Sequence, residues 1–152
     1  MKWIGRILQT RRALVAPIAI VLFASVAVAA TSQFSLPGGN YDVVAVVTAD
    51  ANGAEVVFTG NIWEEEVDLS IGVDGSGDIL VNGVSIGSAN GTSVFRIIAM
   101  FELQSNGDYL VDVYVANSQT GALLCSKLDV AVSGDVSDVE ASGLVVHSLS
   151  AS

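Results

Sequence analysis

The chain has 152 residues, of which 51% are hydrophobic and 14% are charged, with 16 acidic and 6 basic side chains. This length suits one domain that buries roughly two-thirds of its unfolded surface, and the apolar content excludes a disordered chain. Four of the basic residues precede residue 13, so the rest of the chain is a polyanion. Charge repulsion excludes nucleic acid and anionic lipid as its partners.

Residues 1–30 predict a secretory signal peptide. Lys2, Arg6 and Arg11-Arg12 form a basic start, residues 13–28 are mostly apolar, and cleavage after Ala29 or Ala30 fits equally well. The apolar run is shorter than the roughly 20 residues of a spanning helix. We therefore expect an exported protein, secreted, periplasmic or on the cell surface, with no membrane segment after cleavage.

Removal of the signal peptide would change the charge balance. The basic residues that remain, Arg96 and Lys127, and the sixteen acidic residues give a net charge of −14. The segment Thr10-Arg11-Arg12-Ala13 partly resembles a twin-arginine export signal, but Leu14 stands where that signal prefers Phe. General secretion and twin-arginine export are therefore both open.

Residues 31–40 are expected to be a flexible N-terminal leader, and residues 41–152 a single β domain, because strand signals dominate there and helix signals are nearly absent. Residues 41–49 are apolar on both faces, as in a central strand. Residues 66–73 alternate between apolar and polar, and Asn82-Gly83 predicts a type I′ hairpin turn. The predicted strands are residues 41–49, 55–59, 66–73, 78–81, 84–86, 94–103, 109–115, 123–132 and 144–149.

Strands at spacings of roughly 8–12 residues predict an all-β fold, an antiparallel β-sandwich. Our first choice is an immunoglobulin-like architecture, and the alternative is a jelly roll or a small barrel. In the strand predicted over residues 123–132, strict alternation places Leu128 and three further apolar side chains inward. Lys127 and Asp129 then take the opposite face, which Cys125 shares, although its hydrophobic neighbours favour a buried, unreactive thiol.

One glycine-rich segment has the spacing of a calcium loop. Asp74, Ser76 and Asp78 match the first three oxygen ligands of an EF-hand-type loop, but Ile79 and Ser85 stand where its glycine and its bidentate glutamate belong. The same residues suit a turn, because glycine adopts positive φ and aspartate accepts hydrogen bonds from nearby backbone N–H groups. We interpret the segment as a turn, with a weak calcium site as the alternative; no other cofactor is predicted.

Trp63 stands beside three consecutive acidic residues, Glu64 to Glu66. An exposed tryptophan beside carboxylates is suited to stacking on a sugar ring, whereas a tryptophan in the core is the structural alternative. If Glu65 faced inward like its neighbours of the same parity, burial would raise its pKa. A bulge at the start of the strand would leave all three acidic side chains in water.

The remaining reactive residues do not form a catalytic set. His147 is the only histidine and Cys125 the only cysteine, so an ordinary zinc site and an internal disulfide are excluded within one chain. No nucleophile elbow, phosphate-binding loop or dinucleotide motif is present. The triplet Asn90-Gly91-Thr92 is a sequon for N-glycosylation at Asn90.

Two hypotheses from different classes follow. The first is a non-enzymatic structural or adhesive module of the cell surface or extracellular space, which self-assembles into oligomers or filaments when residues 31–40 add a strand to a neighbouring sheet. The alternative is a carbohydrate-binding module or a small glycan-active enzyme that uses Trp63 and two of the carboxylates.

Overall fold

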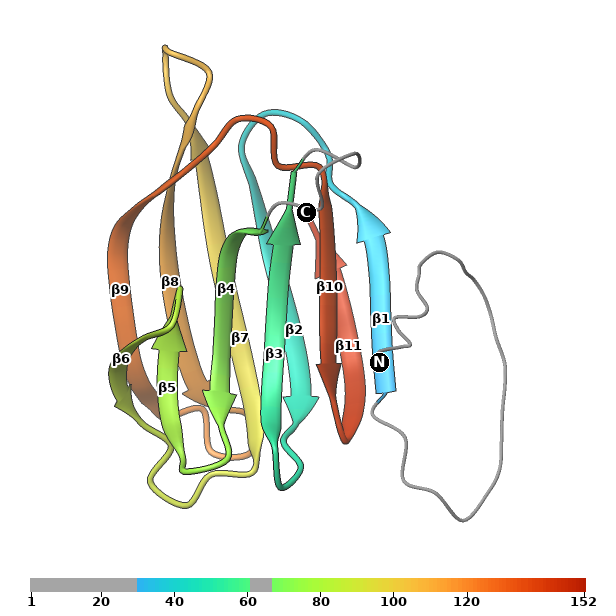
Figure 1. Cartoon of the computed structure of the whole chain (residues 1–152), viewed down its shortest axis with the longest axis vertical. Helices are drawn as coiled ribbons and strands as arrows, with labels where there is room; N and C mark the ends of the chain where they lie inside the picture. The colour runs from blue at the N-terminus through green and yellow to red at the C-terminus, as the bar shows by residue number, and fades with distance from the viewer. Residues whose placement is uncertain (1–29, 61–66) are drawn as a thin grey trace.

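The computed structural model describes residues 30–60 and 67–152, and it consists of two antiparallel sheets packed face to face (Figure 1). The predicted antiparallel β-sandwich is confirmed. Within the described residues, one sheet has six strands in the order β1-β10-β3-β4-β5-β6, and the other has five in the order β11-β2-β7-β8-β9. The strands are β1 (Ala30–Ser35), β2 (Tyr41–Thr48), β3 (Gly53–Thr59), β4 (Val67–Asp74), β5 (Asp78–Val81), β6 (Val84–Ser88), β7 (Val94–Leu103), β8 (Tyr109–Asn117), β9 (Leu123–Val132), β10 (Asp138–Gly143) and β11 (Val145–Ala151).

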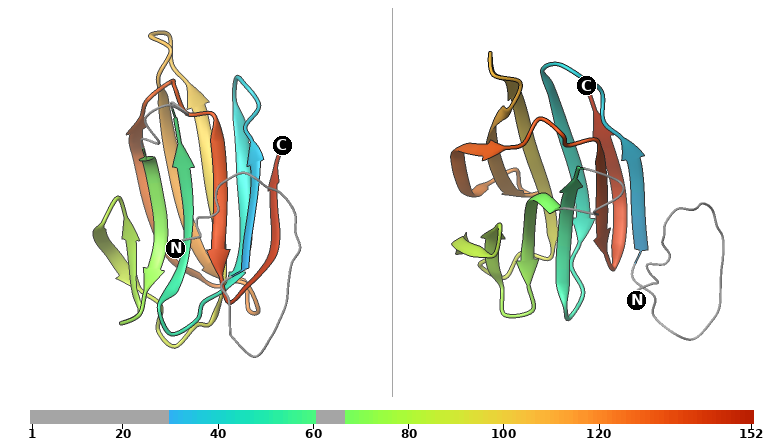
Figure 2. Two further views of the ribbon diagram at one scale, coloured as in Figure 1. Left: turned by 45° about the vertical axis from the view of Figure 1, so that its right-hand side comes forward. Right: turned by 45° about the horizontal axis from the view of Figure 1, so that its top comes forward.

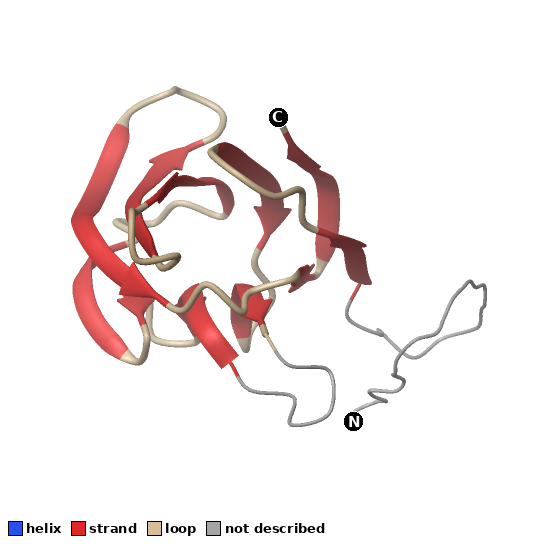
Figure 3. Cartoon of the chain, turned by 90° about the horizontal axis from the view of Figure 1, so that it is seen from above, coloured by secondary structure: helices blue, strands red, loops and turns tan. Residues whose placement is uncertain are grey.

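The strand number exceeds that of an immunoglobulin-like domain. Immunoglobulin domains have seven or nine strands, whereas the described part of this chain has eleven. Figures 2 and 3 show the two layers from the side and from above. Neither described range contains a helix that could span a membrane.

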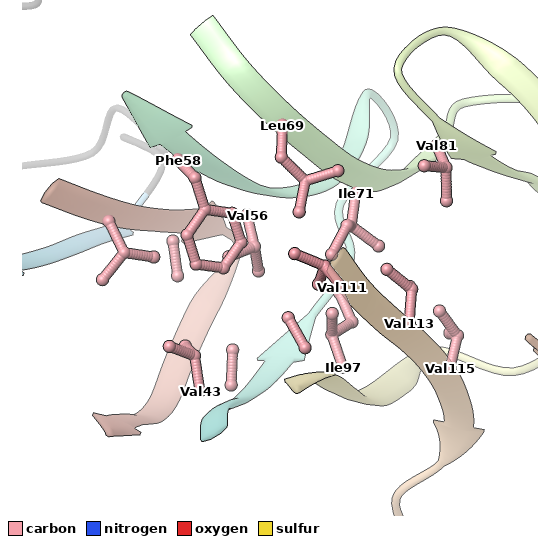
Figure 4. Close-up of a cluster of buried hydrophobic side chains, with 14 of the residues drawn as sticks. Val43, Val56, Phe58, Leu69, Ile71, Val81, Ile97, Val111, Val113 and Val115 are labelled. Atoms are coloured by element: carbon pink, nitrogen blue, oxygen red, sulfur yellow. The ribbon is translucent and has the colours of Figure 1, made fainter. Parts of the chain in front are cut away.

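The hydrophobic core lies between the two sheets and comes from alternate residues of the strands. Phe58, Leu69 and Ile71 of the six-stranded sheet meet Ile97 and Val113 of the five-stranded sheet (Figure 4). Each of these side chains is at most 2% exposed, so the period-2 alternation of the sequence is the alternation between core and outer face. One end of the core is aromatic, and its members are Tyr41, Phe58, Phe101 and Tyr109.

Most strands lie where the sequence predicts them. Strands β7 and β9 have the predicted bounds, and the turn between β5 and β6 has the positive φ angles of 50° at Asn82 and 79° at Gly83 that a type I′ turn requires. Strand β2 lies between β11 and β7, which fits its two apolar faces.

The structure corrects the expectation of a flexible leader over residues 31–40. Residues 30–35 form β1, which pairs with β10 from Ala30↔Gly143 to Ser35↔Asp138. The half-buried Phe34 packs against the core. Neither β1 nor β10 was predicted as a strand, because their outward residues are polar and their inward residues are mostly small. β10 pairs with β1 on one side and with β3 on the other.

The structure also corrects the parity predicted for β9. The pairing of β8 with β9 shifts between Val111 and Val113, and Asp129 has φ of 55° at this bulge. A bulge adds one residue and so reverses the faces beyond it. Leu128 is therefore 53% exposed rather than buried. Cys125, expected opposite the inward apolar side chains, instead pairs with inward-facing Val115 and packs against the core.

Candidate functional site

A groove of about 380 Å³ lies on the outer face of the six-stranded sheet. Its lining comes from neighbouring strands β10, β3, β4 and β5 and from two adjoining turns. The side chains that give it its chemistry alternate with core residues, so they point away from the sandwich. The lining residues are Asp50, Asn52, Gly53, Ala54, Glu55, Ser70, Gly72, Val73, Asp74, Leu80, Gly83, Ser142 and Gly143.

The groove exists because small residues occupy its floor. Along the sheet, Ser142 pairs with Glu55, Glu55 with Gly72, and Gly72 with Leu80. A Cβ atom at Gly72 would lie 2.8 Å from the carbonyl oxygen of Ala54, so this position accepts only glycine without a shift of the backbone. The result is a floor of backbone and small side chains between Glu55 on one side and Leu80 on the other.

Glu55 is the carboxylate in the middle of this row. Its pKa is raised, first because the surrounding protein removes part of its water and second because Glu140 repels its charge. Glu140 lies two residues before Ser142 on β10, so it is the diagonal neighbour of Glu55 on the same face. Although the Glu55 residue is exposed overall, its carboxylate is in an environment that disfavours the negative charge.

Two ordered turns border the groove, one beside Gly53 and the other beside Ser70. The Asp50 carboxylate accepts a hydrogen bond from the backbone N–H of Asn52 at 2.7 Å. The backbone N–H of Ser70 donates to Oδ1 of Asn82 at 2.8 Å, and the N–H of Asn82 donates to the carbonyl oxygen of Ser70 at 2.9 Å. These bonds hold the loops in place, so the groove is formed before any ligand arrives.

The candidate calcium residues lie at the turn between β4 and β5, and one of them, Asp74, lines the groove. Oδ1 of Asp74 accepts hydrogen bonds from the N–H of Ser76 at 2.9 Å, from the Ser76 hydroxyl at 2.7 Å and from the N–H of Asp78 at 3.0 Å. The Ser76 hydroxyl and these N–H groups lower the pKa of Asp74. Within the described ranges, no group of three or more His, Cys, Asp or Glu residues is arranged to hold a metal ion.

The remaining candidate residues do not join the groove. Trp63 and Glu64 to Glu66 lie outside the described residues. Asn90 has φ of 49° in the turn before β7 and is exposed. His147 is exposed at a bulge of β11, and its Nε2 lies 2.7 Å from the hydroxyl of Thr48.

Cys125 of β9 lies against Gly87 of β6, where edge strands of the two sheets are in contact. A Cβ atom at Gly87 of β6 would lie 3.0 Å from its Sγ, so the cysteine fills the space that this glycine leaves. Burial raises the pKa of the thiol, which favours an unreactive, protonated cysteine.

Sequence reasoning did not select Glu55, Ser70, Gly72, Leu80 or Ser142 as site residues. The polar face of the strand over residues 66–73 was a signal, because Ser70 and Gly72 alternate with apolar residues. This alternation predicts that one face of the strand is exposed to solvent, but it does not predict which strands lie beside it. The sheet order brings β10, a strand from the far end of the chain, beside β3.

Comparisons with known proteins concern the fold alone. No protein-family model matches the chain, and no curated protein matches its sequence. The structure is similar to galectin LEC-6 of Caenorhabditis elegans, with a TM-score of 0.53 and 17% identity over 80% of this chain and 89% of that one. A sialidase is also similar, with a TM-score of 0.49 and 9% identity over 75% of this chain and only 10% of the sialidase.

Proposed function

We propose that the groove on the six-stranded sheet binds carbohydrate. The observation that carries this proposal is the composition of the groove, in which carboxylate, hydroxyl and amide oxygens surround a small-residue floor with one apolar side chain. Sugars present hydroxyl groups on their edges and C–H groups on their faces. Glu55, Ser70 and Ser142 are suited to the hydroxyl groups, and Leu80 is suited to a C–H face.

Two further facts are consistent with this function. A volume of about 380 Å³ lies within the range of about 300–1,000 Å³ that small-ligand sites occupy. The structural similarity to a galectin, a carbohydrate-binding β-sandwich, agrees in fold. Sugar binding would also suit the exported location that residues 1–30 predict.

A glycan array with two matched variants tests the proposal. Ser70→Trp places a large side chain in the groove, whereas Ser126→Trp makes the same change on exposed β9 of the other sheet. We expect the wild type and Ser126→Trp to bind the same glycans and Ser70→Trp to lose at least about tenfold in affinity, or roughly 1.4 kcal/mol. Equal binding by all three folded proteins, or an array without any signal, would contradict carbohydrate binding in the groove.

The role of Trp63 in sugar stacking stays a prediction, because this residue lies outside the described ranges. We expect Trp63→Ala to weaken glycan binding if the ring stacks on a sugar. Unchanged affinity would assign the binding to the groove residues alone.

The structural or adhesive hypothesis also stays a prediction, with less support. Strand β1 is at the edge of the six-stranded sheet, where strand exchange with a second copy can occur, but it is paired with β10 of its own chain. Exchange would therefore break this pairing first. Light scattering of the mature protein with and without residues 31–40 tests the hypothesis, and strict monomers in both cases would reject it.

A further inference from the structure

The groove is negatively charged, and none of the described residues that line it is basic. Among its lining residues, Asp50, Glu55 and Asp74 carry carboxylates and none carries a positive charge. Glu140 adds a further carboxylate beside Glu55. In the described part of the chain the two Lys and Arg residues, Arg96 and Lys127, lie on β7 and β9 of the other sheet.

This imbalance sets the class of ligand that can cover Glu55. A neutral sugar that displaced water from Glu55 would add to a desolvation that already raises the pKa of this carboxyl group. An anionic sugar would add repulsion from three further carboxylates. A ligand with an ammonium group would instead supply the missing counter-charge and a charge-assisted hydrogen bond.

The rest of the lining argues for a sugar rather than a simple amine. Leu80 lies across Gly72 from Glu55, so the floor between them is flat and has an apolar margin. Ser70 and Ser142 place hydroxyl groups on the same face. An extended polyamine has neither a ring face for Leu80 nor hydroxyl groups for the two serines.

We propose that the groove prefers sugars that carry a protonated amine, the class of glucosamine oligosaccharides, over neutral and anionic sugars. This inference rests on the proposed carbohydrate function and adds the charge of its ligand. The ammonium group lies at Glu55, with Glu140 beside it, and the sugar ring lies over Gly72 against Leu80.

Calorimetric titration with two oligosaccharides of equal length tests this preference. One is a glucosamine oligomer, and the other is its fully N-acetylated form, which has the same rings without the positive charge. At slightly acidic pH and physiological salt, we expect the wild type to bind the amine form about tenfold more tightly. Glu55→Gln should lose most of this preference, and it keeps the size of the side chain so that the fold is preserved.

Glu102→Gln is the matched control, because Glu102 is an exposed glutamate on β7 of the other sheet. It changes the net charge by the same amount and should keep the full preference. If Glu102→Gln lost as much preference as Glu55→Gln, or if Glu55→Gln kept it, the attraction would be a property of the whole polyanion and the proposal would be overturned.

Two other outcomes separate this inference from the proposed function. Equal affinity of the wild type for the amine and acetylated forms would overturn the charge preference while carbohydrate binding still stood. Spermine that bound as tightly as the glucosamine oligomer, with the same sensitivity to Glu55→Gln, would show that the groove recognises an amine and not a sugar. Absence of binding to every sugar would contradict the proposed function itself.

Discussion

The outer faces of the two sheets differ although the same alternation builds both. On the six-stranded sheet, the central row runs through Ser142, Glu55 and Gly72. On the five-stranded sheet, the corresponding central row runs through Val44, Ile98 and Tyr114, which are half-buried. Both faces lie over one shared core, so the core does not distinguish them.

The two outer faces therefore differ through their outward-facing residues alone. On the five-stranded sheet, large side chains in adjacent strands pack against one another across the outer face and leave little space between them. Small side chains and a glycine leave that space open above the six-stranded sheet, and carboxylates border it. The groove is therefore a consequence of the small side chains on its floor.

The largest expected effect is the loss of stability when Gly72, on the floor of the groove, is replaced. In Gly72→Ala the new Cβ would press on the carbonyl oxygen of Ala54 at 2.8 Å, so we expect the free energy of unfolding to fall by about 1–3 kcal/mol. Ser126→Ala on the other outer face should change it by less than about 0.5 kcal/mol. Urea unfolding monitored by tryptophan fluorescence measures both, and equal stability of the two variants would show that the floor of the groove tolerates a side chain.

A smaller effect concerns the core that both faces share. The hydroxyl of Tyr41 is buried and has no hydrogen-bond partner among the described residues, and its ring stacks on Phe101 with 4.7 Å between centroids. Burial, with the nearby Tyr109, raises the pKa of Tyr41. Because Tyr41→Phe removes an unsatisfied polar group and keeps the ring, we expect the free energy of unfolding to rise by about 1 kcal/mol. Thermal unfolding checks this, and a lower midpoint would mean that the hydroxyl makes a stabilising contact.

The smallest expected effect is the pH dependence of stability that Glu55 contributes. The folded-state pKa of Glu55 is raised, so its contribution to stability is fully present below the ordinary carboxyl pKa of about 4.3 and is lost as pH rises through the folded value. Glu55→Gln cannot ionise and should therefore gain stability relative to the wild type as pH rises through this window.

Glu102→Gln on the other outer face is the reference for this measurement, because it makes the same chemical change away from the groove. Denaturant unfolding at a series of pH values compares the two variants with the wild type. A stability difference for Glu55→Gln that did not grow with pH would contradict the raised pKa.

Much of the fold was predictable from local patterns. Strands β7 and β9 have their predicted ends because turn residues border long alternating runs. The hairpin between β5 and β6 follows from Asn82-Gly83, a pair that accepts positive φ at low cost. The pair β1 and β10 was missed because their sequences have few large apolar residues, and their strand structure depends on pairing with distant segments, β1 with β10 and β10 also with β3.

The site was less predictable than the fold. The sequence favoured a turn around Asp74 with a calcium site as the alternative, and the Asp74 carboxylate accepts hydrogen bonds within this turn. Glu55 and Ser142 are 87 positions apart in the sequence and are directly paired across β3 and β10. Nothing in either local segment indicates this pairing, because the order of strands in a sheet depends on the packing of the whole chain.

Local sequence patterns were sufficient to predict most of the strands, the apolar face of most of them and the hairpin at Asn82-Gly83, because these properties depend on neighbours a few positions away. The order of the strands depends on the packing of the whole chain. The same packing places the bulge that turns Cys125 toward the core, and it brings together Glu55, Gly72, Leu80 and Ser142 in one groove. Backbone hydrogen bonds between strands are nearly the same for all residue types, so they do not determine which strands pair. The burial of the common core selects the pairing, and the outer face follows from that selection.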